Sequence, residues 1–250
     1  MKKTIPFLLV ALLITACLPQ DVQVPQSPLL PVLERKSGLI GYIGIDGNIY
    51  ISDQGGRNPT AVTKDAAPPD NQSGAFHLYQ YPTWSRDGSQ LAFVGVSVEG
   101  DKQTLSEMFV KRVDEDQLNK VYSSETEHPF YLYWSPDNKH VSFLSTDATG
   151  QSLILQSVSV DGGERVILDA GSPYYWSWAP DGSALIVHAG NANSSTPEHM
   201  AFLQVDSEVI EDGLDSNPAS FQAPAWSPDG SRILLTRVND QKKKEIVLAD

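Results

Sequence analysis

The sequence predicts an all-β protein built from repeated four-stranded antiparallel sheets, and three observations support that prediction. Four of the five tryptophans stand at one position of a repeated motif. Each of the four is followed by the residues of a tight turn and then by an apolar strand. Eighteen glycines and 17 prolines in 250 residues place turns throughout the chain, which disfavours a helical bundle.

The repeated motif is clearest at 223–236, where it reads Ala-Pro-Ala-Trp-Ser-Pro-Asp-Gly-Ser-Arg-Ile-Leu-Leu-Thr. In the turn, Pro fixes φ at the second position, Asp suits the third, and Gly takes the positive φ that follows. A third and a fourth strand follow in each complete unit, and four antiparallel strands in about 45 residues are typical of a β-propeller blade. The recurring tryptophans and aspartates are therefore assigned to the core and the turns: Trp84, Asp87, Trp134, Asp137, Trp178, Asp181, Trp226 and Asp229.

Five units are visible, and two of them are incomplete. The first lacks its opening strand, three are complete, and the last stops after its third strand. That makes 18 expected strands, more than a four-bladed ring needs and fewer than a five-bladed one. We expect an incomplete ring whose chain stops within a blade; a genuine five-bladed product is the alternative. The units lie near 38–63, 81–123, 131–169, 175–215 and 223–250.

Composition narrows the classes of function. The chain has 18 basic and 31 acidic residues, a formal charge of −13, so it lacks the basic footprint of a nucleic-acid binder. A single cysteine permits neither an intramolecular disulfide nor a cysteine-based zinc site. The sequence has no Gly-x-Ser-x-Gly elbow, no His-Glu-x-x-His and no phosphate-binding glycine loop. We therefore expect no catalytic residues, no metal and no cofactor.

The N-terminus predicts export and lipidation. A basic start, Met1–Lys3, precedes 12 mostly apolar residues, Ile5–Ala16. Such a segment is too short to span a bilayer, which takes about 20 residues, and it fits a secretory signal. It ends in Ile-Thr-Ala-Cys17, which resembles the bacterial lipobox, in which the cysteine is acylated and becomes the new N-terminus. A plain signal peptide with an incidental cysteine is the alternative. The expected domains are a signal peptide at 1–16, an acylated cysteine with a proline-rich tether at 17–37, and the propeller at 38–250.

The tether contains four prolines and no glycine. Proline-rich chain is extended and semi-rigid, at about 3.1 Å per residue, and would hold the folded part off the lipid surface. In the other reading, part of this segment packs on the domain as an N-terminal strand. We expect the protein in the cell envelope, held outside the cytoplasm by the lipid on Cys17.

The repeat as a whole resembles that of TolB-like, WD-like propellers. The resemblance rests on Trp-Ser-Pro-Asp-Gly, the strand that follows it, a later Ile-Tyr-Ile-like strand and an Asp-x-Gly-Gly turn, and it covers about Gly38–Asp250. The chain before the repeats shows no α/β domain, which departs from the periplasmic TolB pattern, and so does the lipobox. The resemblance implies a fold shared by many proteins and does not specify a function.

Two functions are compatible with this reading. The first is a membrane-anchored, non-catalytic propeller that binds a protein or peptide. The alternative is the N-terminal propeller of a prolyl-oligopeptidase-like serine peptidase whose catalytic domain is absent from this chain. Trp176 breaks the repeat. With Tyr174 and Tyr175 it is the candidate binding site, and we expect it to face the channel or a rim, because Tyr and Trp are favoured at binding hot spots.

Overall fold

The structure is a computed structural model that describes residues 38–250, except 70, 100–102, 148–149, 151, 192–196, 206–208, 215–217 and 220–222. The residues from Leu39 to Asp250 belong to one compact unit. The predicted signal peptide, Cys17 and the tether lie outside the described residues. No helix among the described residues is long and apolar enough to cross a membrane.

Eighteen strands make up the described part of the chain. The first two sheets contain β1 (Ile40–Ile43), β2 (Ile49–Ser52), β3 (Thr60–Ala61), β4 (Phe76–Trp84), β5 (Gln90–Glu99), β6 (Gln103–Arg112) and β7 (Leu118–Ser124). The next two contain β8 (Phe130–Trp134), β9 (His140–Thr146), β10 (Leu153–Ser159), β11 (Val166–Gly171), β12 (Tyr174–Trp178), β13 (Ala184–Ala189), β14 (His199–Val205) and β15 (Val209–Gly213). The last contains β16 (Ala225–Trp226), β17 (Ile233–Val238) and β18 (Lys244–Ala249).

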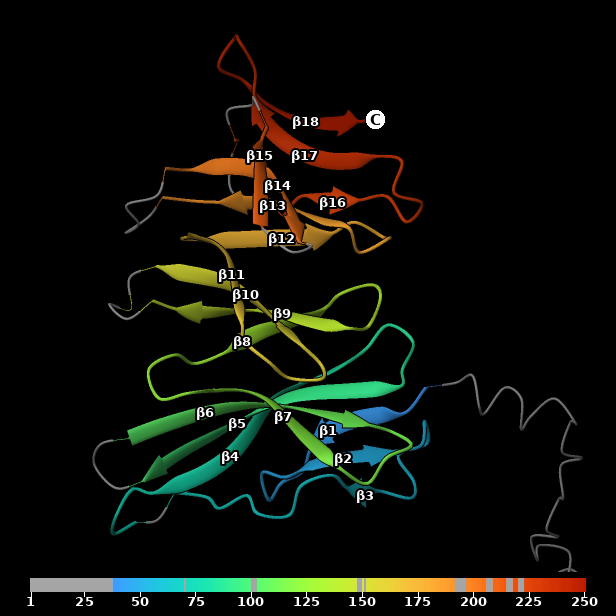
Figure 1. The fold of residues 1–250 in the computed structure, drawn as a ribbon, viewed down its shortest axis with the longest axis vertical. Coiled ribbons are helices and arrows are strands. Elements are labelled where there is room, and N and C mark those ends of the chain that lie inside the picture. Colours follow the sequence, from blue (N-terminus) through green and yellow to red (C-terminus); the bar gives the residue numbers. More distant parts are fainter. Residues whose placement is uncertain are drawn as a thin grey trace, which may run out of the picture. The chain divides into compact units, whose positions relative to one another are not determined.

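The strands form five antiparallel sheets that follow one another along the chain (Figure 1). The first sheet is β1-β2-β3, the three middle sheets have four strands each, and the fifth is β16-β17-β18. Within every sheet, strands consecutive in sequence are hydrogen-bonded neighbours. The predicted all-β fold is confirmed, and among the described residues the first and the fifth sheets have three strands each.

The turn after each repeat tryptophan has the expected backbone. The fourth turn residue takes a positive φ in all four of these turns, at Gly88 (71°), Asn138 (60°), Gly182 (78°) and Gly230 (73°). Glycine adopts this conformation without a steric cost, and asparagine tolerates it better than most other residues. The turn residues therefore direct the first strand of each unit back into the second.

The turn aspartates hold these hairpins together. The Asp229 carboxylate accepts hydrogen bonds from the Ser227 hydroxyl at 2.6 Å and from the Ser231 main-chain N–H at 3.1 Å. These bonds stabilise the charged form and lower the pKa of Asp229 to about 2. Asp87, Asp137 and Asp181 accept equivalent main-chain hydrogen bonds, and their pKa values are also lowered.

An Asp229→Asn variant is expected to be less stable than the wild type near neutral pH. Because the folded-state pKa of Asp229 is depressed, its stabilising effect is present above the ordinary pKa of 3.8 and is lost as the pH falls towards about 2. The urea midpoints of variant and wild type should therefore differ at about pH 6 and converge at about pH 2. Asp240→Asn, in the last hairpin, is the matched control and is expected to leave the urea midpoint at about pH 6 close to that of the wild type. Equal midpoints for Asp229→Asn and wild type at both pH values would contradict this role.

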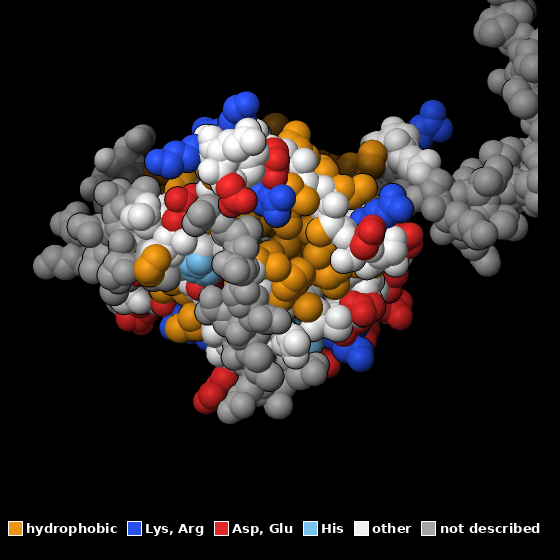
Figure 2. All heavy atoms as spheres, turned by 90° about the horizontal axis from the view of Figure 1, so that it is seen from above, with side chains coloured by type: hydrophobic (Ala, Val, Ile, Leu, Met, Phe, Trp, Pro, Cys, Tyr) orange, Lys and Arg blue, Asp and Glu red, His pale blue; other side chains and the backbone are white. Residues whose placement is uncertain are grey.

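The core lies between consecutive sheets. In β5, the residues from Gln90 to Val96 are all buried, because the second sheet has a neighbour on each face. Strand β18 instead alternates between exposed and half-buried residues. The outward face of the fifth sheet exposes Leu234, Ile246 and Leu248, and hydrophobic side chains gather on the face seen in Figure 2.

Candidate functional site

Exposed tyrosines project from the first strands of the second and third sheets. Strands β4 and β8 contact each other. Tyr81 on β4 and Tyr131 on β8 both stand three residues before the repeat tryptophan. The pairing of β4 with β5 shifts register between Gln80 and Thr83, and that of β8 with β9 shifts between Phe130 and Tyr133. Each tyrosine therefore occupies a β-bulge, a feature that re-aims a side chain and is over-represented beside functional sites.

The backbone at both tyrosines is strained. Tyr81 and Tyr131 each have a φ of 56°, a left-handed conformation that bulky residues rarely adopt. Such a conformation costs on the order of 1–3 kcal/mol and tends to cluster at ligand-binding sites. The same strain at the same position of two repeats indicates a feature that the surrounding fold maintains.

The strained positions direct aromatic side chains into solvent. Tyr81 is 43% exposed, Tyr131 64% and the neighbouring Tyr133 49%. Tyr81 lies against His128, with ring centroids 6.4 Å apart. We name Tyr81, His128, Tyr131, Tyr133 and Trp176 the aromatic surface.

Trp176 contributes to this surface from beneath. Its ring packs edge-on against Tyr131 and Tyr133, with centroids 5.7 and 6.4 Å apart. Its indole Nε1 donates to the Ser142 hydroxyl at 3.1 Å, and the residue is only 9% exposed. The expectation that Trp176 faces the channel or a rim is therefore corrected: alternation along β12 turns it to the same side as buried Trp178, and the two tyrosines cover it.

The same alternation along β12 turns the other two residues of the predicted site, Tyr174 and Tyr175, to opposite faces of the sheet. Tyr174 is buried at 3% exposure, and its hydroxyl donates to Asp169 at 2.7 Å. Tyr175 points to the opposite face of the sheet from Trp176 and is half-buried. The three aromatic residues therefore do not form one exposed cluster.

Sequence reasoning missed Tyr81, His128, Tyr131 and Tyr133. The recurring tyrosine three residues before the tryptophan was the available signal, since it occurs at Tyr81, Tyr131 and Tyr175. The repeat tryptophans lie in or beside the core: Trp134 and Trp178 are each 6% exposed, and Trp84 and Trp226 are half-buried.

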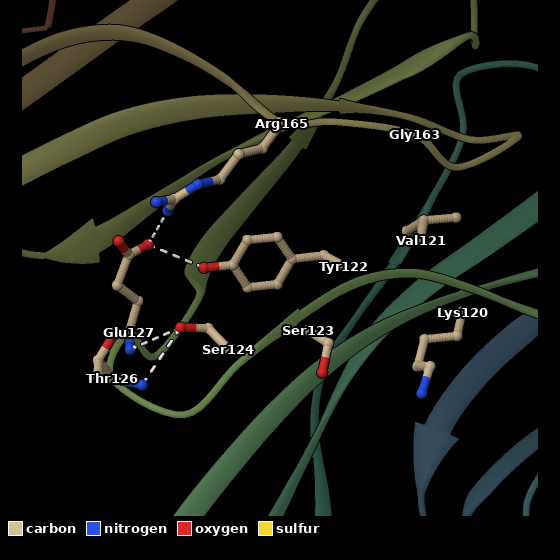
Figure 3. A pocket seen from close by; sticks show the side chains of 9 residues that line it. All are labelled: Lys120, Val121, Tyr122, Ser123, Ser124, Thr126, Glu127, Gly163 and Arg165. Carbon is tan, nitrogen blue, oxygen red and sulfur yellow. Dashed lines mark hydrogen bonds and ion pairs between the residues drawn. The ribbon is translucent and has the colours of Figure 1, made fainter.

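A polar pocket of about 430 Å³ is lined by residues of β7, of the loop that follows it and of the loop before β11 (Figure 3). Glu127 and Arg165 form an ion pair at one side of it. One carboxylate oxygen of Glu127 also accepts from the Tyr122 hydroxyl at 2.8 Å and from Gln156 Nε2 at 2.9 Å. Burial acts to raise the pKa of Glu127, but the hydrogen bonds from Gln156 and Arg165 outweigh it and hold that pKa below its usual range.

This network joins neighbouring sheets. Tyr122 belongs to β7 of the second sheet, Gln156 to β10 of the third, and Glu127 to the loop between the two sheets. All four side chains of the network are used in contacts with one another. Among the described residues, no three His, Cys, Asp or Glu side chains are grouped as metal ligands would be.

The likeness of this chain to known proteins is a likeness of structure. No protein-family model matches this chain, and no curated protein matches it. Dipeptidyl peptidase 4 of Porphyromonas gingivalis has a similar structure, with a TM-score of 0.62 at 10% sequence identity, over 85% of this chain and 36% of that one. The chain has a β-propeller fold.

Two TolB structures also align with this propeller. TolB from Acinetobacter baumannii is 18% identical over 86% of this chain, with a TM-score of 0.47. A putative TolB from Agrobacterium tumefaciens is 18% identical over 77% of this chain, with a TM-score of 0.45. The propeller spans 51% and 62% of the length of those two chains.

Proposed function

We propose that this protein is a membrane-anchored, non-catalytic propeller of the cell envelope that binds a protein or peptide at the aromatic surface. The main support is the pair of strained, exposed tyrosines at equivalent repeat positions. Tyrosine offers a large contact area with little conformational entropy to lose, and aromatic residues are enriched at binding hot spots. The lipid anchor at Cys17 rests on the lipobox alone.

A Tyr131→Asn variant tests the binding surface. Asparagine tolerates a positive φ, so the bulge is expected to persist while the ring is lost. Panning a peptide library on the wild-type protein supplies ligands, and their affinity for the variant should fall about tenfold or more, as for a hot-spot residue. Tyr50→Asn on the first sheet is the matched control and should change affinity by less than about twofold. Equal losses in the two variants would count against the aromatic surface.

A Cys17→Ser variant tests the anchor. Without the thiol the chain cannot be acylated, so it should leave the membrane fraction or remain unprocessed. Membrane fractionation with mass measurement of the N-terminal peptide checks both results. An identical membrane-bound, mature form in variant and wild type would rule out lipidation at Cys17.

A second function is favoured by the likeness to dipeptidyl peptidase 4. In that case the propeller would be the N-terminal part of a serine peptidase of the prolyl-oligopeptidase type. Sequencing the locus beyond the codon for Asp250 discriminates the two, because a peptidase domain would contain a Gly-x-Ser-x-Gly motif.

A further inference from the structure

Among the described strands, none pairs with the first sheet on the side where every other sheet has its first strand. Strand β1 pairs with β2 alone among the described strands. The Gly44 N–H donates to the Asn48 carbonyl at 2.7 Å, so Gly44 and Asn48 are a hydrogen-bonded pair. Antiparallel pairs alternate, and the N–H and C=O groups of Gly41 and Ile43 therefore point away from β2, towards the open edge.

A buried hydrogen-bond donor lies beside that edge. The Trp84 indole Nε1 is buried and has no partner. It would lie 3.1 Å from a Cβ added to Gly41, so it is next to β1. A buried N–H without an acceptor destabilises the fold, and an acceptor supplied by a partner would remove that cost.

The tryptophan at the equivalent position of the third sheet has an acceptor for its indole N–H. Trp134 Nε1 donates to the main-chain carbonyl of Thr83, on the first strand of the preceding sheet, at 3.1 Å. Thr83 pairs with Ala92 of β5. In the repeat, Gly41 of β1 stands at the position that Ala92 holds in β5, so a residue opposite Gly41 would correspond to Thr83. The buried Nε1 of Trp226 also lacks an acceptor, so an unpartnered indole N–H does not by itself identify a binding site. At Trp84, however, the unpartnered donor coincides with an unpaired strand.

The sequence before β1 favours a strand supplied by another molecule. In the four other units a turn with Asp and then Gly or Asn connects the first strand to the second. The corresponding positions before β1 are Lys36 and Ser37, which are not the residue types that favour this turn.

We propose that the open edge of β1 accepts an extended segment of a partner polypeptide. This inference rests on the proposed function and adds a second contact region to it. The segment pairs antiparallel with Gly41 and Ile43, and its main-chain carbonyl opposite Gly41 accepts the Trp84 indole hydrogen. Such strand addition takes its affinity from main-chain hydrogen bonds.

The test uses the full chain and a synthetic peptide, Leu-Tyr-Gln-Tyr-Pro-Thr-Trp, which copies the first strand at 78–84. Amide hydrogen exchange at Gly41 and Ile43 should slow at least about tenfold on saturation with peptide. Fluorescence anisotropy should show binding about tenfold weaker or more in Ile43→Pro, since proline lacks the N–H that faces the edge and is tolerated on edge strands. Ile43→Ala keeps that N–H and should bind within about twofold of wild type. Thermal melts of both variants check that each is folded.

Three outcomes would overturn the proposal. The first is slow exchange at both amides without peptide, lost on removal of residues 1–37, because the chain itself would then supply the strand. The second is the absence of any exchange change on adding peptide. The third is peptide binding that Tyr131→Asn weakens and Ile43→Pro leaves unchanged; the proposed function would then stand and the β1 edge would not.

Discussion

Replacing Trp178 by alanine is expected to lower the free energy of unfolding by about 3–5 kcal/mol, the cost of truncating a large buried aromatic residue. Trp178 is 6% exposed and packs in the cluster that contains Leu185 and Leu203. Its indole Nε1 also donates to the Ser142 hydroxyl of the preceding sheet at 3.1 Å, so the variant loses a contact between sheets as well. Urea unfolding followed by circular dichroism measures the loss.

Trp226→Ala is the matched comparison, because Trp226 holds the same repeat position but is half-buried. It should cost clearly less than Trp178→Ala. Trp176→Ala should approach Trp178→Ala, since both indoles donate to Ser142 and both residues are buried. A series in which Trp226→Ala is the most damaging would contradict the assignment of burial along these strands.

A Glu127→Gln variant is expected to lower the free energy of unfolding by about 2–3 kcal/mol, in the range for hydrogen bonds to a charged group. The change removes the charge opposite Arg165 and places an amide where Tyr122 and Gln156 donate. The Glu127 side chain is 12% exposed and that of Arg165 is 36% exposed, so solvent screens the pair in part and the lower end of the range is expected.

The matched control for Glu127 is Glu107→Gln. Glu107 pairs with Lys120 at 2.8 Å, but the Lys120 side chain is 55% exposed, and surface pairs contribute about 0–1 kcal/mol. Adding Arg165→Met both to the wild type and to the Glu127→Gln variant completes a double-mutant cycle, which gives the coupling energy of the pair. Equal destabilisation by Glu127→Gln and Glu107→Gln would show that the network contributes no more stability than a surface ion pair.

The strands and turns of this propeller were predictable because their signals are local. Period-two alternation places the strands, and Ser-Pro-Asp-Gly places the hairpins. The bulges at Tyr81 and Tyr131 were not predictable in this way, because a register shift depends on the partner strand. The same reason explains the error at Trp176: its neighbours Tyr131 and Tyr133 are more than 40 residues away in sequence. The network of Glu127 likewise assembles groups from three separate segments.

The contacts between sheets have a consequence for how this molecule loses its structure. They join neighbours in chain order, such as β1 with β4, β4 with β8, and β12 with β16. In arrays of this kind, stability approximates a sum of unit and nearest-neighbour terms. Among the described residues, the first and the fifth sheets each have a neighbouring sheet on one face only and should open before the three middle sheets. Unfolding would then begin at the two terminal sheets and advance towards the middle of the array.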